Sequence, residues 1–223
     1  MGSRMKNEIS HLKVPAHELV YQNLRELILF GEIAPGQTVT IKGLIEQLNA
    51  GMTPVREAIR RLSAEGALTF QGNRRVIVPT LSEQNVSELN FLRRALEPKL
   101  IAMATKRVKS EDIEDLRRID RELDNAIKSG DINAYLRQNY WFHKTLYKLA
   151  EAPILDQVVD ILWLRYGPSL RVVCGRIGTL NLTDQHKETL NAMSDGDAQR
   201  AADAIRADIT QGIDQIKYSM RNS

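Results

Sequence analysis

The sequence contains a single cysteine, Cys174, and no run of about 18 apolar residues of the kind that spans a bilayer. One cysteine cannot form an intrachain disulfide, which argues against the oxidising export route. The first residues, MGSRMKNEISHLK, lack the apolar core that a signal peptide needs. We therefore expect a cytoplasmic protein with no membrane partner.

An excess of one sign of charge is also nearly absent. The 223 residues carry a net charge of +3, and this excess lies in residues 1–80, which hold 10 Lys and Arg against 7 Asp and Glu. Residues 81–223 hold 21 of each sign. So small an excess does not by itself identify nucleic acid as the partner.

The first third of the chain shows three helical segments followed by a hairpin. Apolar residues recur at helical spacing in three ranges, 16–31, 41–51 and 53–62. Thr53 is suited to the N-cap of the third helix, and Pro54 to its first position.

Two short strands follow, at residues 68–70 and 76–78, around a turn at Gly72 and Asn73. Residues 32–40, between the first two helices, read as a Pro-Gly turn. The order predicts a winged helix-turn-helix.

The remainder of the chain shows no strand-like alternation. Its helical patterns predict an all-α bundle, with helices at 82–107, 110–129, 131–149, 153–173, 183–195 and 197–220. Side chains typical of N-caps precede or begin four of them: Ser110, Asp131, Thr183 and Asp197. The predicted fold class is therefore mainly α, with a flexible segment at 1–14, a winged helix-turn-helix domain at 15–80 and an all-helical domain at 81–223.

The third helix has two different faces. Val55, Ala58, Ile59 and Leu62 form one apolar stripe, whereas the side chains of Thr53, Arg56 and Arg60 share a separate arc of roughly 60°. A recognition helix needs one face packed on its domain and another that reaches base edges and phosphates. A surface helix with scattered arginines is the alternative. Arg74 and Arg75, beside the hairpin turn, suit a phosphate or the minor groove.

The stretch ILFGEIAPGQTV…LIEQLNAGMTPVREAIRRLSAEGALTF resembles the N-terminal domain of GntR-superfamily bacterial transcription regulators. The helical remainder resembles the FadR-like branch with its FCD-type effector domain. Position by position, the resemblance implies DNA contacts at Lys42, Thr53, Arg56, Gly72 and Asn73. One departure stands directly before Thr53. The family usually has Ser-Arg or Thr-Arg there, and this chain has Gly-Met, so one contacting arginine is missing.

Four polar side chains fall on or beside apolar faces of the predicted bundle. Asn139 and His143 lie one turn apart on one helix, His186 aligns with the apolar residues of a second helix, and Asp208 lies beside the stripe of a third. Buried polar groups need partners. These residues can satisfy one another or hold a divalent metal, for which zinc, nickel and manganese suit the donor types. The alternative is that each is hydrogen-bonded separately.

The resemblance adds specific roles to these residues. Many FCD-type domains bind a metal through an aspartate and three histidines. His143 and His186 match this pattern, while Asn139 stands at the aspartate position and Asp208 at the third histidine position. Arg94 matches an arginine that often lines the effector pocket, where its guanidinium would suit a carboxylate. A surface arginine paired with Glu97 or Glu88 is the alternative.

These observations predict a homodimeric, ligand-responsive transcription regulator that is not an enzyme. It would bind a palindromic operator in double-stranded DNA, and a small organic acid would contact Arg94, Asn139, His143 and His186. A metal-dependent hydrolase using His143, His186 and Asp208 is the alternative, although no general base is placed near them by spacing. In a third reading, the winged helix binds a protein partner.

Overall fold

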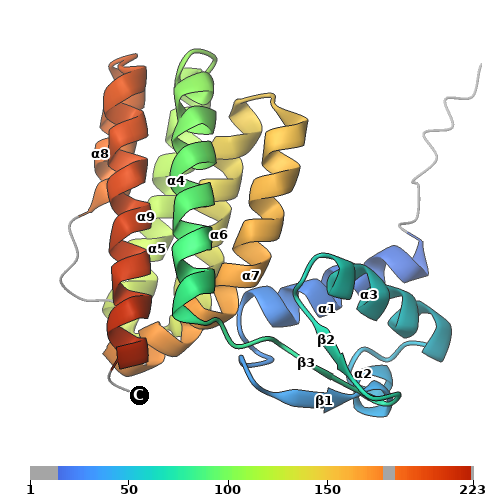
Figure 1. Cartoon of the computed structure of the whole chain (residues 1–223). Coiled ribbons are helices and arrows are strands. Elements are labelled where there is room, and N and C mark those ends of the chain that lie inside the picture. Colours follow the sequence, from blue (N-terminus) through green and yellow to red (C-terminus); the bar gives the residue numbers. More distant parts are fainter. Residues whose placement is uncertain (1–14, 178–183, 222–223) are drawn as a thin grey trace, which may run out of the picture.

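The computed structural model describes residues 15–177 and 184–221, so the predicted flexible segment at 1–14 lies outside the described residues. The chain forms an N-terminal head and a helical bundle (Figure 1). The elements of the head are α1 (Ala16–Leu29), β1 (Thr38–Thr40), α2 (Ile41–Gln47), α3 (Met52–Ala64), β2 (Thr69–Gln71) and β3 (Arg75–Ile77). Those of the bundle are α4 (Glu83–Thr105), α5 (Ser110–Ser129), α6 (Ile132–Leu149), α7 (Pro153–Ile177), α8 (Gln185–Ser194) and α9 (Ala198–Arg221). The predicted winged helix-turn-helix followed by an all-α bundle is confirmed.

The wing is a three-stranded antiparallel sheet in the order β1-β3-β2. Val39 and Phe70 both lie opposite Val76, whose side chain is buried. β1 corrects the prediction of a simple turn at residues 32–40. Three residues are too few to show a period of two in the sequence, and this strand exists because its backbone pairs with β3.

The third helix begins earlier than predicted. Gly51 occupies the N-cap position and makes no side-chain capping bond, so Thr53 is the second helical residue and not the cap. Pro54 still lies in the first turn, where its missing N–H has no intrahelical partner to lose. As predicted, the apolar stripe of Val55, Ala58, Ile59 and Leu62 is buried; α3 packs against α1.

Side-chain caps satisfy the first N–H groups of several bundle helices. Asp131 accepts from the Ala134 N–H at 3.0 Å, and Asp197 accepts from the Arg200 N–H at 3.0 Å, as expected of the predicted caps. Ser110 is the first residue of α5 and not its cap. Thr183 lies outside the described residues, and Asp184 caps α8. Among the described residues, no helix is long and apolar enough to cross a membrane.

The head lies beside one end of the bundle, with α1 against α7 (Figure 1). Arg25 pairs with Asp160 of α7 at 2.8 Å. Arg137 of α6 pairs with Glu26 of α1 at 3.0 Å and with Glu32, just beyond that helix, at 3.2 Å. Helix α6 therefore touches the head directly, and the same helix carries Asn139 and His143.

Candidate functional site

The outer face of α3 is open, as a recognition helix requires. Thr53, Arg56 and Arg60 are exposed on the side opposite the buried stripe. Within the described part of the chain, neither arginine has an ion-pair partner. Unpaired guanidinium groups on an exposed helix face are available to an external anion, because no internal carboxylate competes for them.

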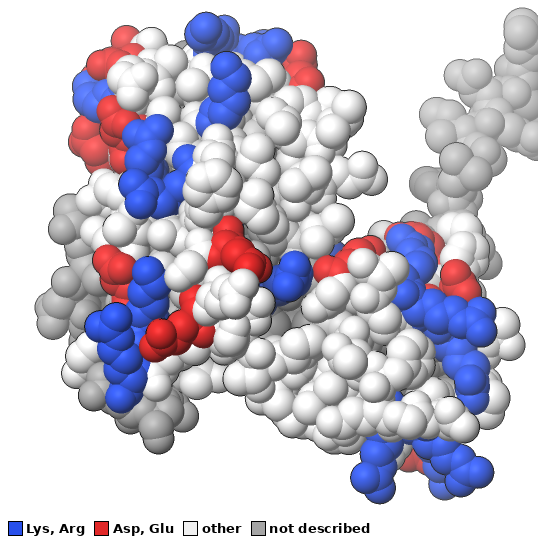
Figure 2. All heavy atoms as spheres, in the orientation of Figure 1, with Lys and Arg blue, Asp and Glu red and all other residues white. Residues whose placement is uncertain are grey.

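The other predicted contacts lie on exposed positions of the same domain. Figure 2 shows basic side chains on the outer part of the head, where Figure 1 places α2, α3 and the β2–β3 turn. The backbone joins Lys42 to the wing, because the N–H of the preceding residue, Ile41, donates to the carbonyl of Arg74 at 3.0 Å. Gly72 has a φ of +66°, the left-handed conformation that a tight hairpin turn requires. Asn73, Arg74 and Arg75 follow it and are exposed.

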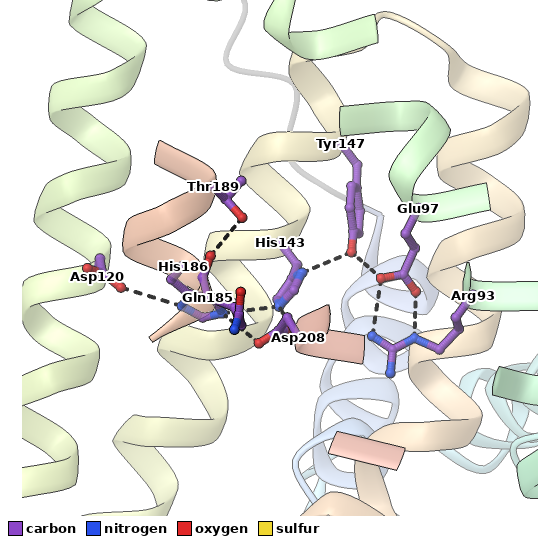
Figure 3. A network of polar contacts seen from close by, with 9 residues as sticks. All are labelled: Arg93, Glu97, Asp120, His143, Tyr147, Gln185, His186, Thr189 and Asp208. Atoms are coloured by element: carbon purple, nitrogen blue, oxygen red, sulfur yellow. Dashed lines mark hydrogen bonds and ion pairs between the residues drawn. The ribbon is translucent and has the colours of Figure 1, made fainter. Parts of the chain in front are cut away.

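The inward-facing histidines of the bundle meet, although they come from different helices (Figure 3). His143 of α6 and His186 of α8 place their Nε2 atoms 3.3 Å apart. Asp208 of α9 lies 3.2 Å from His143 Nε2 and 3.7 Å from His186 Nε2. Both histidines are buried and the carboxylate is mostly so. The predicted convergence is therefore present in the structure.

Residues outside the His143–His186–Asp208 cluster orient both imidazole rings. The Tyr147 hydroxyl donates to Glu97 at 2.5 Å and lies 3.0 Å from His143 Nδ1, so Nδ1 must supply the proton of that second contact. His186 Nδ1 lies 3.4 Å from Asp120. With each Nδ1 used as a donor, the neutral form of each ring directs its Nε2 lone pair toward the other ring and Asp208.

This donor set fits a metal ion. Two ligands held at about 2.1 Å from a tetrahedral ion are separated by about 3.4 Å, close to the 3.3 Å between the two Nε2 atoms and the 3.2 Å between His143 Nε2 and Asp208 Oδ2. One ligand atom from each of His143, His186 and Asp208 lies within 4.8 Å of the others. Asn139, the fourth predicted ligand, is buried one turn before His143. Imidazole nitrogens with a carboxylate and an amide oxygen suit the predicted zinc, nickel or manganese.

The pKa values of the three cluster residues shift in different directions. Burial lowers the pKa of His143 below its usual value, although Asp208 opposes this. Burial also acts to lower the pKa of His186, but the carboxylates of Asp120 and Asp208 outweigh it and raise that pKa. Burial acts to raise the pKa of Asp208. The hydrogen bond from His143 and the positive charges of His143, His186 and Arg93 outweigh burial and lower this pKa to about 2. The cluster therefore keeps an ionised carboxylate.

The structure distinguishes two adjacent arginines of α4. Arg94, the predicted effector residue, is exposed, whereas Arg93 is 1% exposed. Arg93 binds Glu97 through Nε at 2.5 Å and Nη2 at 3.2 Å, and its guanidinium lies over the rings of Trp163 and Tyr166. Its Nη1 is buried without a hydrogen-bond partner among the described residues. Arg93, and not Arg94, therefore faces the interior.

A small cavity of about 30 Å³ adjoins the cluster. Arg93, Asn139 and Asp208 lie on its wall, together with Trp163 and Tyr166. The cavity thus combines a buried cation, an amide and a carboxylate with aromatic surface. Such a site can bind a few polar atoms of a ligand, and an oxygen acceptor would satisfy Arg93 Nη1.

Sequence reasoning missed the residues that support the cluster, namely Arg93, Glu97, Asp120 and Tyr147. On α4 and α5, the spacing of buried residues in the sequence could have identified three of them. Asp120 continues the buried stripe of Ile113, Leu116 and Leu123, and Arg93 and Glu97 continue the buried spacing of α4. A polar residue on an apolar stripe is the same pattern that marks His143 and His186 on their helices.

Comparison with known proteins agrees with both halves of the structure. Residues 16–78 match the family described as "Bacterial regulatory proteins, gntR family", and residues 88–211 match the FCD domain. The chain is 30% identical over 165 residues to the HTH-type transcriptional regulator McbR of Escherichia coli (strain K12), an alignment covering 74% of this chain and 75% of McbR. It is 28% identical over 193 residues to the Nta operon transcriptional regulator of Aminobacter aminovorans, covering 85% and 89% of the two chains.

The solved structure of E. coli McbR/YncC superimposes on this chain with a TM-score of 0.88 at 26% identity, covering 93% of this chain and 100% of that one. These relatives are transcription regulators, and the hydrolase alternative finds no support in them. The chain therefore belongs to the GntR family of bacterial regulatory proteins, with an FCD domain after its winged helix-turn-helix, and it is a DNA-binding transcription regulator and not an enzyme.

Proposed function

We propose that this regulator acts in the cytoplasm as a homodimer whose two α3 helices read a palindromic operator, and that an effector bound in the helical domain changes operator affinity. We place the DNA-binding domain at 15–80 and the effector domain at 81–223. The observation that carries the proposal is the contrast between unpaired, exposed arginines on α3 and a buried His-His-Asp cluster in the bundle. Half-sites would lie about one helical turn of DNA apart.

The DNA face consists of Thr53, Arg56 and Arg60 on α3, with Lys42, Gly72, Asn73, Arg74 and Arg75 beside it. Neutralising Arg56 and Arg60 together should weaken operator binding and reduce the slope of log affinity against log salt by about two per head, because each lost phosphate contact removes about one unit. If one of these arginines forms hydrogen bonds to a base, the loss of affinity should be larger for the operator than for unrelated DNA.

Arg118→Ala is the matched control, because this arginine is exposed on α5 of the bundle, away from the head. Fluorescence anisotropy over a salt series measures both variants. An unchanged slope in the Arg56→Ala, Arg60→Ala protein would contradict the proposed face and would favour a protein partner for the winged helix.

Support for the homodimer comes from apolar side chains on the outside of α4 and α7, which pack side by side. Phe91 of α4 is 72% exposed and Ile154 of α7 is 77% exposed; Val158 and Ile161 extend the apolar surface along α7. Exposed apolar area of this kind marks an interaction surface. Phe91→Glu with Ile154→Glu should yield monomers in sedimentation analysis, whereas Trp141→Glu, at an exposed apolar position of α6, should leave the dimer intact. A dimer that survives the double change uses another surface.

For the effector domain, we propose that His143, His186 and Asp208, with Asn139, hold a divalent metal. When bound, the metal would supply a Lewis-acid centre for an anionic oxygen. His143 and His186 are oriented for this role by Tyr147 and Asp120, and Asp208 supplies the negative charge.

Metal content after purification without metal-affinity resin, followed by titration with zinc, nickel and manganese, tests this site. His186→Ala and Asp208→Ala should each lose metal, whereas His17→Ala, an exposed histidine of α1, should not. Equal metal content in the wild-type protein and all three variants would contradict the assignment.

We propose a small organic acid as the effector, with Arg93 in place of the predicted Arg94. A carboxylate oxygen at Arg93 Nη1 would satisfy a buried donor that otherwise has no partner. The α6 contacts of Arg137 with α1 would carry the change to the head, as a shift between dimers that fit the operator and dimers that do not. Operator affinity measured with and without saturating acid tests this, with Arg94→Ala as the control for Arg93→Met. If no bound acid changes operator affinity, the mechanism fails.

A further inference from the structure

The first residue of the recognition helix is a large apolar side chain that the fold does not bury. Met52 is 58% exposed at the start of α3. The core contacts of this helix are supplied by Val55, Ala58, Ile59 and Leu62, and Met52 lies at the edge of that stripe, about 20° around the helix axis from Ile59. More than half of the Met52 side chain nevertheless remains outside that core.

The position of Met52 on the helix places it between the buried stripe and the polar contact residues. Measured around the helix axis from Met52, Arg56 lies at about 40°, Arg60 at about 80° and Thr53 at about 100°. All three are exposed, as Met52 is. In a helix-turn-helix, the N-terminal residues of the second helix of the motif approach base edges in the major groove. Met52 thus lies exposed at the N-terminal edge of the proposed DNA face.

The major groove offers one apolar feature, the C5-methyl group of thymine. A methionine side chain cannot donate a hydrogen bond to guanine or to a phosphate, and its unbranched thioether adapts its shape to an apolar partner. We propose that Met52 is a specificity-determining residue that selects thymine, through its methyl group, at one position of each half-site. This inference rests on the proposed DNA face of α3.

The test removes only the thymine methyl. An operator is first selected from random duplex DNA by the full-length protein, and each thymine is then replaced in turn by deoxyuridine. For the wild-type protein, one replacement per half-site should cost about fourfold in affinity, the value expected for burying one methyl group. For Met52→Ala, the same replacement should cost almost nothing, and Met52→Arg should change the selected base at that position from thymine to guanine.

Leu19→Ala is the matched control, because Leu19 is an exposed apolar residue of the head that lies on α1. It should keep the wild-type response to deoxyuridine. If every replacement costs the same in wild type and Met52→Ala, or if Met52→Arg selects the same sequence as wild type, the inference is wrong. Either result leaves the proposed function standing as long as Arg56→Ala, Arg60→Ala weakens operator binding. Failure of the wild-type protein to enrich any sequence would instead remove the proposed function.

Discussion

The head and the bundle use charged residues in opposite ways. On α3 of the head, Arg56 and Arg60 are exposed and have no ion-pair partner among the described residues. In the bundle, Arg93 is buried, bound twice by Glu97 and enclosed by aromatic rings. An exposed cation is stabilised by water and needs no partner within the protein. A buried cation has lost that hydration, and it must therefore be paired within the fold. The exposed arginines are therefore fully available to an external anion, whereas Arg93 uses Nε and Nη2 within the fold and leaves only Nη1 without a partner among the described residues.

The largest expected effect comes from breaking the buried pair. Glu97→Ala leaves the Arg93 guanidinium buried without a counter-charge, and we expect the free energy of unfolding to fall by about 3–5 kcal/mol. Arg56→Ala on α3 should change it by less than about 0.5 kcal/mol. Urea denaturation monitored by circular dichroism measures both.

A second variant shows whether the charge or the packing is responsible. Arg93→Met with Glu97→Leu removes both charges together, and this protein should be more stable than Glu97→Ala. Equal losses in the two proteins would mean that packing, and not an unpaired charge, dominates at this position.

The next effect concerns the contact between the two regions. A Cβ atom at Gly167 of α7 would lie 2.3 Å from the carbonyl oxygen of Leu29 in α1, so Gly167→Ala must push the helices apart. We expect a loss of about 1–3 kcal/mol in the free energy of unfolding, as for other overpacked sites. Thermal unfolding measures it, with Lys128→Ala on the exposed surface of α5 as the control. A neutral result would show that the head and bundle are not held in this contact.

A smaller effect should appear in the pH dependence of metal binding. The raised pKa of His186 means that a metal must displace a proton from that ring, whereas His143, with its lowered pKa, is already neutral. Metal affinity should therefore be constant above the His186 pKa and fall about tenfold per pH unit below it, as one proton competes. Calorimetric titration of zinc in buffers of different ionisation enthalpy counts that proton. Release of none would contradict the role of His186.

The smallest effect is expected from an ion pair on the bundle surface. Lys187 contacts Asp124 at 3.0 Å and Asp184 at 2.5 Å, but its side chain is half exposed. Lys187→Ala should cost less than about 1 kcal/mol of unfolding free energy, because water solvates these charges in both states. If Lys187→Ala lost as much unfolding free energy as Glu97→Ala, burial would not explain the difference between the exposed Lys187 pairs and the buried Arg93–Glu97 pair.

The sequence predicted the helices and their order well where the pattern was long. The apolar stripe of α3 and the caps at Asp131 and Asp197 could be read from local spacing, because helical periodicity and capping act within a few residues. β1 was missed because a three-residue strand is defined by its partner. The family resemblance points to Arg94, whereas the structure buries Arg93, and periodicity does not decide which of two adjacent residues faces inward.

By itself, the sequence determined the two-part architecture, because this follows from the order of helical and strand patterns along the chain. It also determined the open face of α3 and the inward direction of His143, His186 and Asp208, because each of these follows from the spacing within one helix. Only the tertiary structure decided that Asp120, Tyr147 and Glu97 orient the two imidazole rings, and that Arg93 adjoins them. Those contacts join helices far apart in the chain, and no spacing within one helix records how another helix is rotated against it.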